Sequence, residues 1–196
     1  MEELDTEEFV ILAVALDEDV DAVRQWARDE PPTPLTYPVL VDRDHLVAEL
    51  YGIVNVPTTI WIDEDGRIVR PVSIAPADNK FQEFTKIDAE VHNDALRAWV
   101  RDGVAPLDED AVRARLDAPS FEVQQARAER RLAMHLVRSG HAEAGERHLA
   151  IALRLAPDDW TIHRGSMPLR GKDPFGQEFF DFYESWEAAG RPGYGS

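Results

Sequence analysis

The side chains that could carry chemistry in this sequence are histidines and acidic residues, because the 196 residues include no cysteine. Without cysteine, they form no disulfide and offer no thiolate as a metal ligand or nucleophile. Histidine can bind metals or transfer protons. The six histidines are His45, His92, His135, His141, His148 and His163. None lies in a metal-binding pattern such as His-Glu-x-x-His, so we expect solvated or helix-terminal histidines and no metal or cofactor.

Three aspartates with alternating spacing, Asp17, Asp19 and Asp21, resemble a set of oxygen ligands for calcium. A calcium-binding EF-hand loop also needs a central glycine and a terminal glutamate, and both are missing from this stretch. We interpret the three acids as helix-start residues. The sequence also lacks a Gly-x-Ser-x-Gly motif and a phosphate-binding glycine loop. It therefore predicts no catalytic residue within these 196.

The charge balance restricts the partners that the protein can bind. Thirty-eight acidic and 21 basic residues give a formal net charge of −17. This charge repels phosphate backbones and anionic lipid surfaces, and no compensating basic patch is visible. We expect no binding to nucleic acid or membranes.

The start of the chain carries no targeting signal that the sequence reveals. The longest apolar run, residues 9–16, is far shorter than the roughly 20 residues of a transmembrane helix. The first residues are acidic, whereas a secretory signal begins with basic residues. As written, the sequence predicts a cytoplasmic protein; the location stays open if the true start lies upstream.

Two strand–helix units are predicted first. Residues 9–16 are apolar throughout, which is typical of a strand buried on both faces. A helix follows, with Val23 and Trp26 on its inner side, and Pro31-Pro32 ends it. Residues 37–41 then predict a second strand and residues 44–51 a second helix.

A hairpin and another helix complete the predicted first domain. Residues 58–62 and 67–74 read as antiparallel strands, because Asp65-Gly66 between them favours a tight turn. A helix over residues 88–102 is expected to point Val91 and Trp99 inward and to end at Gly103.

The rest of the chain is predicted to be helical. Residues 104–120 are rich in turn-forming types and are interpreted as a linker. Helices are expected over residues 121–139 and 141–155, and an aromatic one over residues 174–189. The sequence thus divides into a domain of residues 1–103, the linker and a helical region of residues 121–196.

The stretch YGIVNVPTTIWIDEDGRIV, residues 51–69, together with the order of elements before it, resembles the redoxin branch of the thioredoxin fold. The TlpA/ResA-like thiol–disulfide oxidoreductases are the nearest group. The resemblance covers residues 1–103 and implies an α/β sheet flanked by helices, with a cis peptide bond before Pro57. It also implies that Val56, Pro57 and Thr58 bind an extended substrate peptide by strand addition. A structural turn proline is the alternative.

The sequence also departs from the family pattern at its start. The family begins with another strand and a Cys-x-x-Cys motif at a helix N-terminus; this sequence has neither, and residues 1–8 look like the end of that helix. The resemblance therefore implies a truncated sheet, with open edges on strands 9–16 and 58–62 unless these two pair directly. We hypothesise that Met1 is an internal methionine, and that a cysteine or selenocysteine motif is encoded upstream, where a selenocysteine codon could be taken for a stop.

Residues 128–159 are similar to one tetratricopeptide repeat. Because such repeats usually need about three copies to bury a core, we expect this one to pack against its own chain, with a groove for a partner as the alternative. Trp160, His163 and Arg164 could complete that small core. They could also form a weak protein-docking patch, since tryptophan and arginine often anchor interfaces.

Two functions follow from these observations. The first is a thioredoxin-like oxidoreductase that reduces protein or peptide disulfides, or peroxides, but whose catalytic segment is absent, so that the chain as written is inactive. The alternative is a non-catalytic thioredoxin-like scaffold that binds a protein partner.

Overall fold

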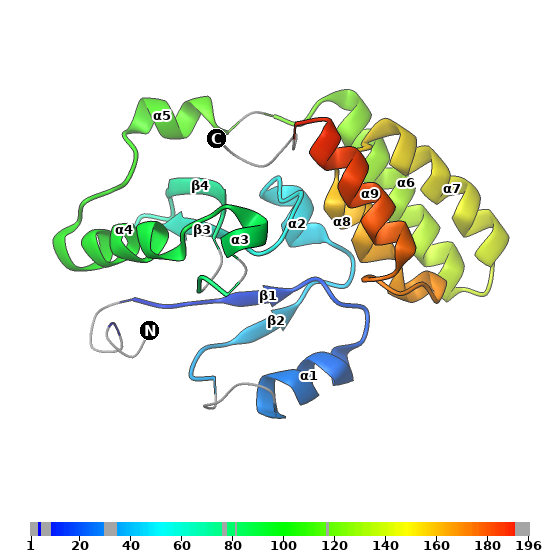
Figure 1. Ribbon diagram of the computed structural model, residues 1–196, viewed down its shortest axis with the longest axis horizontal. Helices are drawn as coiled ribbons and strands as arrows, with labels where there is room; N and C mark the ends of the chain where they lie inside the picture. The colour runs from blue at the N-terminus through cyan, green and yellow to red at the C-terminus, as the bar shows by residue number, and fades with distance from the viewer. Residues whose placement is uncertain are drawn as a thin grey trace. The chain divides into compact units, whose positions relative to one another are not determined.

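The computed structural model describes residue 4 and residues 9–29, 35–75, 78–80, 82–116 and 118–190. The chain has an α/β fold (Figure 1). Its strands are β1 (Ala13–Ala15), β2 (Val39–Val41), β3 (Thr58–Ile62) and β4 (Ile68–Ile74). Its helices are α1 (Val20–Asp29), α2 (Leu46–Leu50), α3 (Gln82–Thr85), α4 (Ala89–Asp102), α5 (Glu109–Ala114), α6 (Phe121–Arg138), α7 (Ala142–Leu155), α8 (Trp160–His163) and α9 (Gln177–Ala188). Within the described ranges, none of these helices has the length and apolar character that a membrane crossing requires.

The chain folds into two compact units that do not follow the predicted linear division. The hairpin unit comprises Met1–Ile11 and Val56–Ala118, and contains β3, β4 and α3 to α5. The helical unit comprises Leu12–Asn55 and Pro119–Ser196, and contains β1, α1, β2, α2 and α6 to α9. The predicted boundary after residue 103 therefore does not coincide with either unit.

Arginines of α6 are the physical reason why the helical unit joins distant parts of the sequence. Arg127 Nη1 donates to the carbonyl of Glu49 at the end of α2, at 2.8 Å. Arg138 donates to Glu18 and to Asp44, with shortest distances of 2.7 Å to each. Because these bonds tie α6 to the segment containing α1 and α2, the helical region is not a separate tail.

The first strand pair lies in the helical unit. β1 and β2 run parallel, with Val14 opposite Leu40. β1 is shorter than the predicted strand of residues 9–16, and its side chains are half-exposed. The expectation of a strand buried on both faces is therefore wrong, because a two-stranded sheet supplies too few neighbours to cover it. Trp26 is also exposed, whereas Val23 is buried as expected; Pro31-Pro32 and most of residues 1–8 lie outside the described residues.

The second strand pair forms the predicted hairpin. β3 and β4 are antiparallel, and the Asp63 carboxylate accepts from the backbone N–H groups of Asp65 and Arg67 in the turn, at 3.0 and 2.8 Å. The strands described form two separate two-stranded sheets, so the direct pairing of the two predicted open edges is not found in this part of the chain.

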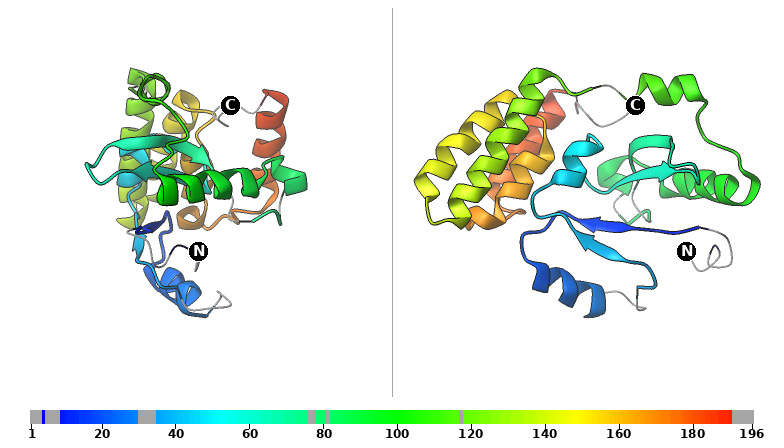
Figure 2. Two further views of the ribbon diagram at one scale, coloured as in Figure 1. Left: turned by 90° about the vertical axis from the view of Figure 1, so that its left-hand side faces the viewer. Right: turned by 180° about the vertical axis from the view of Figure 1, so that it is seen from behind.

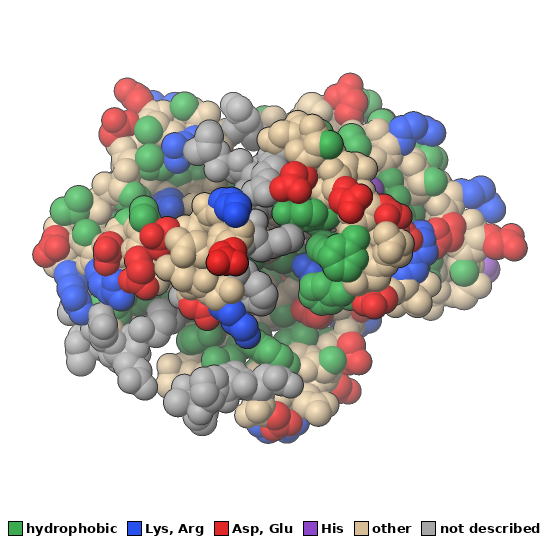
Figure 3. Space-filling model, in the orientation of Figure 1, with side chains coloured by type: hydrophobic (Ala, Val, Ile, Leu, Met, Phe, Trp, Pro, Cys, Tyr) green, Lys and Arg blue, Asp and Glu red, His purple; other side chains and the backbone are tan. Residues whose placement is uncertain are grey.

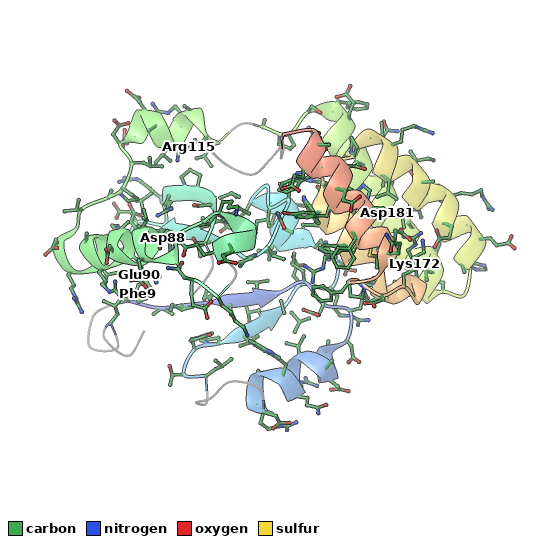
Figure 4. The ribbon with its side chains drawn as sticks, in the orientation of Figure 1. Phe9, Asp88, Glu90, Arg115, Lys172 and Asp181 are labelled. Carbon is green, nitrogen blue, oxygen red and sulfur yellow. The ribbon has the colours of Figure 1, made fainter. Side chains whose placement is uncertain are left out.

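Helices α4 and α5 complete the hairpin unit. Asp88 caps α4 by accepting from the backbone N–H of Glu90 at 3.0 Å, and both residues lie at the start of this helix in Figure 4. The buried side differs from the prediction, since Val91 is 70% exposed and His92 only 9%. α5 lies within the predicted linker, where six residues are too few for a periodic pattern to be visible.

The core of the helical unit lies between α6 and α7, which run side by side in both views (Figures 1 and 2). Gly145 permits their close approach, because a Cβ atom there would lie 2.5 Å from Val137 Cγ2. The core residues are Ala126, Ala133, Met134, Leu149, Ala152, Ala156 and Ile162. This is a helical hairpin; its identity as a tetratricopeptide repeat stays a prediction.

Candidate functional site

The loop before β3 holds the substrate-binding residues predicted from the sequence. The Val56–Pro57 peptide bond is cis, the isomer that the resemblance implies. Val56 and Pro57 are exposed, and Thr58 is half-buried at the start of β3. The carbonyl of Pro57 accepts from the N–H of Ala75 at 3.2 Å, so it is used within the hairpin unit. The loop is thus anchored to the end of β4 while two of its side chains face solvent.

An aromatic layer supports β3 on the side of α4. The Trp61 ring stacks on Trp99 at 5.2 Å between centroids and meets the edge of His92 at 5.4 Å. The guanidinium of Arg70, on β4 opposite Trp61, stands 4.7 Å from the centre of the same ring. These contacts hold the hairpin against α4.

Burial changes the ionisation of the polar groups in this layer. Desolvation, with a smaller contribution from the positive charge of Arg70, lowers the pKa of His92 to about 4. Burial also lowers the pKa of Arg70, with a second contribution from the charge of Arg115. His92 is therefore neutral near pH 7. His92 lies in the first turn of α4, in agreement with a helix-terminal position, but it is buried rather than solvated, because its position seven residues before Trp99 places both on the packed side of α4.

The segment leading to the loop contains two buried polar residues that the sequence analysis did not connect. The Asp42 carboxylate accepts from the N–H groups of Leu46, Val47 and Ala48, at 2.8, 2.7 and 3.2 Å, and thereby begins α2. His45 is 2% exposed, and burial lowers its pKa to about 3. In the sequence, the sign of this role was an aspartate, Asp42, four residues before Leu46 at the start of a predicted helix.

The predicted docking residues lie together in the aromatic part of the helical unit. Trp160 is 7% exposed and meets the ring of Phe182 edge-on at 4.5 Å. His163 stacks on the same ring at 3.8 Å, and burial lowers its pKa. Arg164 stands 4.1 Å over the ring of Phe175. This placement favours the packing interpretation, and a docking role for Trp160, His163 and Arg164 stays a prediction.

The surface over α9 combines hydrophobic and acidic side chains (Figure 3). Phe175 and Phe180 are its large exposed apolar residues. In the described part of the chain, His, Asp and Glu side chains form no group of three or more that could hold a metal ion.

Comparisons with known proteins find similarities in the first part of the chain. The AhpC/TSA family model matches residues 1–70, which include the Pro57 loop and β3. This part is therefore similar to the AhpC/TSA family. Two proteins called thiol-disulfide oxidoreductase ResA, from Bacillus thuringiensis subsp. konkukian and Bacillus cereus, are each 26% identical to the chain over 76 residues.

These matches leave much of the molecule unassigned. Each covers 39% of this chain and 42% of the ResA protein, so the chain spans less than half the length of the curated relatives it matches. No solved structure matches the chain. Since the family match ends at residue 70, helices α6 to α9 lie outside it.

Proposed function

We propose that the redoxin segment binds protein or peptide substrates for thiol–disulfide exchange, or peroxides, in a thioredoxin-like oxidoreductase. The observation that carries this proposal is the loop Val56-Pro57-Thr58, whose first two residues are exposed and which opens β3 within the segment matched by the AhpC/TSA family. In this arrangement Val56 and Thr58 position the backbone of an extended peptide, as in strand addition to a sheet edge. The Pro57 carbonyl, which bonds to Ala75, contributes anchoring rather than substrate contact.

The chemical step needs a residue that these 196 do not supply. In thiol–disulfide exchange, a thiolate attacks one sulfur of a disulfide, forms a mixed disulfide and releases the other sulfur as a thiolate. A selenolate reacts in the same way. Because the chain has no cysteine, the nucleophile of the proposed reaction belongs to a residue outside these 196, and the chain as printed binds but does not react.

A second candidate function is a non-catalytic scaffold that uses the same loop to bind a protein partner. The lack of cysteine favours it, since no further residue is then required. The two candidate functions differ in whether the natural protein contains a reactive cysteine or selenocysteine.

The first test is the intact mass of the natural protein, purified from its source without assuming a start site. A mass above 22.1 kDa, with a cysteine or a selenium isotope pattern and with disulfide reductase activity, supports the oxidoreductase. A mass of 22.1 kDa without such activity supports the scaffold.

The second test addresses the loop itself. We expect an extended peptide carrying a disulfide to shift the amide NMR signals of Val56 and Thr58 in the 15N-labelled chain. Pro57→Ala is expected to weaken this binding about tenfold, equivalent to roughly 1.4 kcal/mol. Pro106→Ala is the matched control, because Pro106 is an exposed proline of the same unit. Equal binding by both variants argues against a recognition role for the loop.

A further inference from the structure

Two buried polar groups of the hairpin unit have no hydrogen-bond partner among the described residues. The hydroxyl of Thr59 on β3 and the Nδ1 atom of His92 on α4 are buried without a hydrogen bond in the described residues. His92 is more than nine-tenths buried. Since the great majority of buried polar groups in proteins are hydrogen-bonded, these two indicate an interaction that the protein alone does not complete.

Arg70 lies in the same neighbourhood and also lacks an acidic partner. A bulge separates the Thr59–Ser73 and Trp61–Arg70 pairs of the hairpin, and Arg70 Nη2 donates to the hydroxyl of Ser73 at 3.0 Å. The guanidinium is half-buried against Trp61. No carboxylate of the described residues forms an ion pair with it, although the chain has 38 acidic residues. Of the five N–H donors of an arginine, this arrangement leaves several for a ligand.

A second arginine reinforces the positive charge at this place. Arg115 follows α5, which packs against β4, and Figure 4 shows it at the end of that helix. Its charge acts on Arg70 and lowers the pKa of that side chain. A nearby like charge disfavours the charged form of each group, and an anion bound at this place would relieve that repulsion.

The neighbouring arginine of α5 shows the contrast. Arg113 forms ion pairs with Glu109 and Asp110, at 3.9 and 3.3 Å. For Arg115, two residues later, no ion pair is found among the described residues. Among the described residues, Arg113 is therefore paired with acids, whereas Arg115, whose charge acts on Arg70, is not.

We propose that Arg70, Arg115 and the Ser73 hydroxyl bind an oxyanion, a carboxylate or a phosphate, beside the unpartnered Thr59 hydroxyl and His92 imidazole. The planar guanidinium matches both groups through two parallel N–H donors. Because the net charge of −17 repels free anions in general, binding here requires this local pair of arginines. The site is independent of the proposed redox function.

The test is a titration of the 15N-labelled 196-residue chain with inorganic phosphate and, separately, with acetate, each at constant ionic strength. We expect saturable shifts of the Arg70 and Ser73 amide signals, the Trp61 indole signal and the His92 ring signals. Saturable shifts with both anions support a general oxyanion site. Saturable shifts with phosphate alone support a phosphate site, and saturable shifts with acetate alone support a carboxylate site. If neither anion gives saturable shifts, the proposal is wrong.

Variants on α5 separate the site from general charge effects. Arg115→Gln, at an exposed position, is expected to weaken the binding of the effective anion about tenfold, whereas the matched Arg113→Gln leaves it within about twofold. Equal effects of the two variants contradict a site that includes Arg115. Because the readout is anion binding, a negative result leaves the proposed redox function untouched.

Discussion

Arg138 of the helical unit and Arg70 of the hairpin unit have different surroundings. In the helical unit, Arg138 donates to the carboxylates of Glu18 and Asp44 and to the carbonyl of Arg43. In the hairpin unit, Arg70 has an aromatic ring and a hydroxyl as its neighbours. Arg138 holds distant segments of the helical unit together. Arg70 forms no ion pair among the described residues, which is why it is the centre of the proposed anion site.

Buried histidines show the same contrast. His45 in the helical unit is closely packed, since a Cβ atom on Gly165 would lie 2.6 Å from its Cε1 atom. His92 in the hairpin unit lies beside the charge of Arg70. Both are held neutral, but only His92 has the proposed anion site next to it.

The largest expected effect is a loss of stability in the helical unit. Trp160→Ala removes a ring that meets four other rings, those of Phe179, Phe182, Tyr183 and Trp186. We expect the free energy of unfolding to fall by about 3–5 kcal/mol, measured by urea denaturation. The control is Trp26→Ala in the same unit, where the side chain is 51% exposed and the expected loss is below about 1 kcal/mol. Equal losses would mean that Trp160 is a surface residue, as the docking hypothesis requires.

The second prediction concerns pH. His45 and His92 have folded-state pKa values of about 3 and about 4, below the usual 6.5. Between those values and 6.5 the folded state binds fewer protons than the unfolded state, so stability falls as the pH falls. Lowering the pH from 7 to 5 is expected to cost about 2 kcal/mol for each histidine. The measurement is the free energy of unfolding at both pH values.

The variant His45→Asn tests this prediction and sharpens the comparison. Asparagine tolerates the positive φ of 58° at this position and does not titrate. The difference in stability between pH 7 and pH 5 should shrink by the share of His45, about 2 kcal/mol. Bound phosphate favours the protonated form of His92 and should reduce the remaining difference. An unchanged pH dependence in the variant would show that His45 titrates normally.

The third prediction removes the paired arginine. Arg138→Gln breaks the contacts to Glu18, whose side chain is 11% exposed, and to Asp44, which is 69% exposed. We expect a loss of about 1–2 kcal/mol, mostly from the buried Glu18, because an exposed ion pair contributes little. Arg113→Gln, whose partners are exposed, is expected to cost less than about 0.5 kcal/mol. Urea denaturation of both variants checks this, and equal losses would contradict a stabilising role for the α6 arginine.

Local features of the fold could be predicted from the sequence, and long-range ones could not. β3 has its predicted bounds because the Asp63 turn and the apolar run define them. On α4, hydrophobicity favoured Val91 as the buried residue, but His92 is buried instead and meets the ring of Trp61. The bonds from Arg138 to Glu18 span 120 positions, and no local pattern contains them.

In the candidate sites too, local features could be predicted and long-range ones could not. The Pro57 loop could be found from a contiguous motif. Arg70 and Arg115 are 45 positions apart, and they become neighbours only because α5 packs against β4. α5 itself has six residues, too few for hydrophobic periodicity to predict it, so the sequence offered no sign that these two charges meet.

The smallest expected effect compares the two arginines that stack on aromatic rings. Arg164 stands over the rings of Phe175 and Phe179, at 4.1 and 5.3 Å, and Arg70 stands over Trp61 at 4.7 Å. In phosphate-free buffer, Arg164→Gln and Arg70→Gln should each lower the free energy of unfolding by about 0.5–1 kcal/mol.

Phosphate then separates the stacking contribution from anion binding. A ligand that binds only the folded state stabilises it by RT ln(1 + [L]/Kd), where [L] is the free ligand concentration. Phosphate should therefore stabilise the unaltered protein and the Arg164→Gln variant but not Arg70→Gln. The measurement is urea denaturation with and without phosphate at constant ionic strength. If phosphate stabilises all three proteins equally, its effect does not pass through Arg70, and the two arginines differ only in the ring that they contact. If phosphate stabilises the other two proteins but not Arg70→Gln, stacking on a ring is common to both units and anion binding is confined to the hairpin unit.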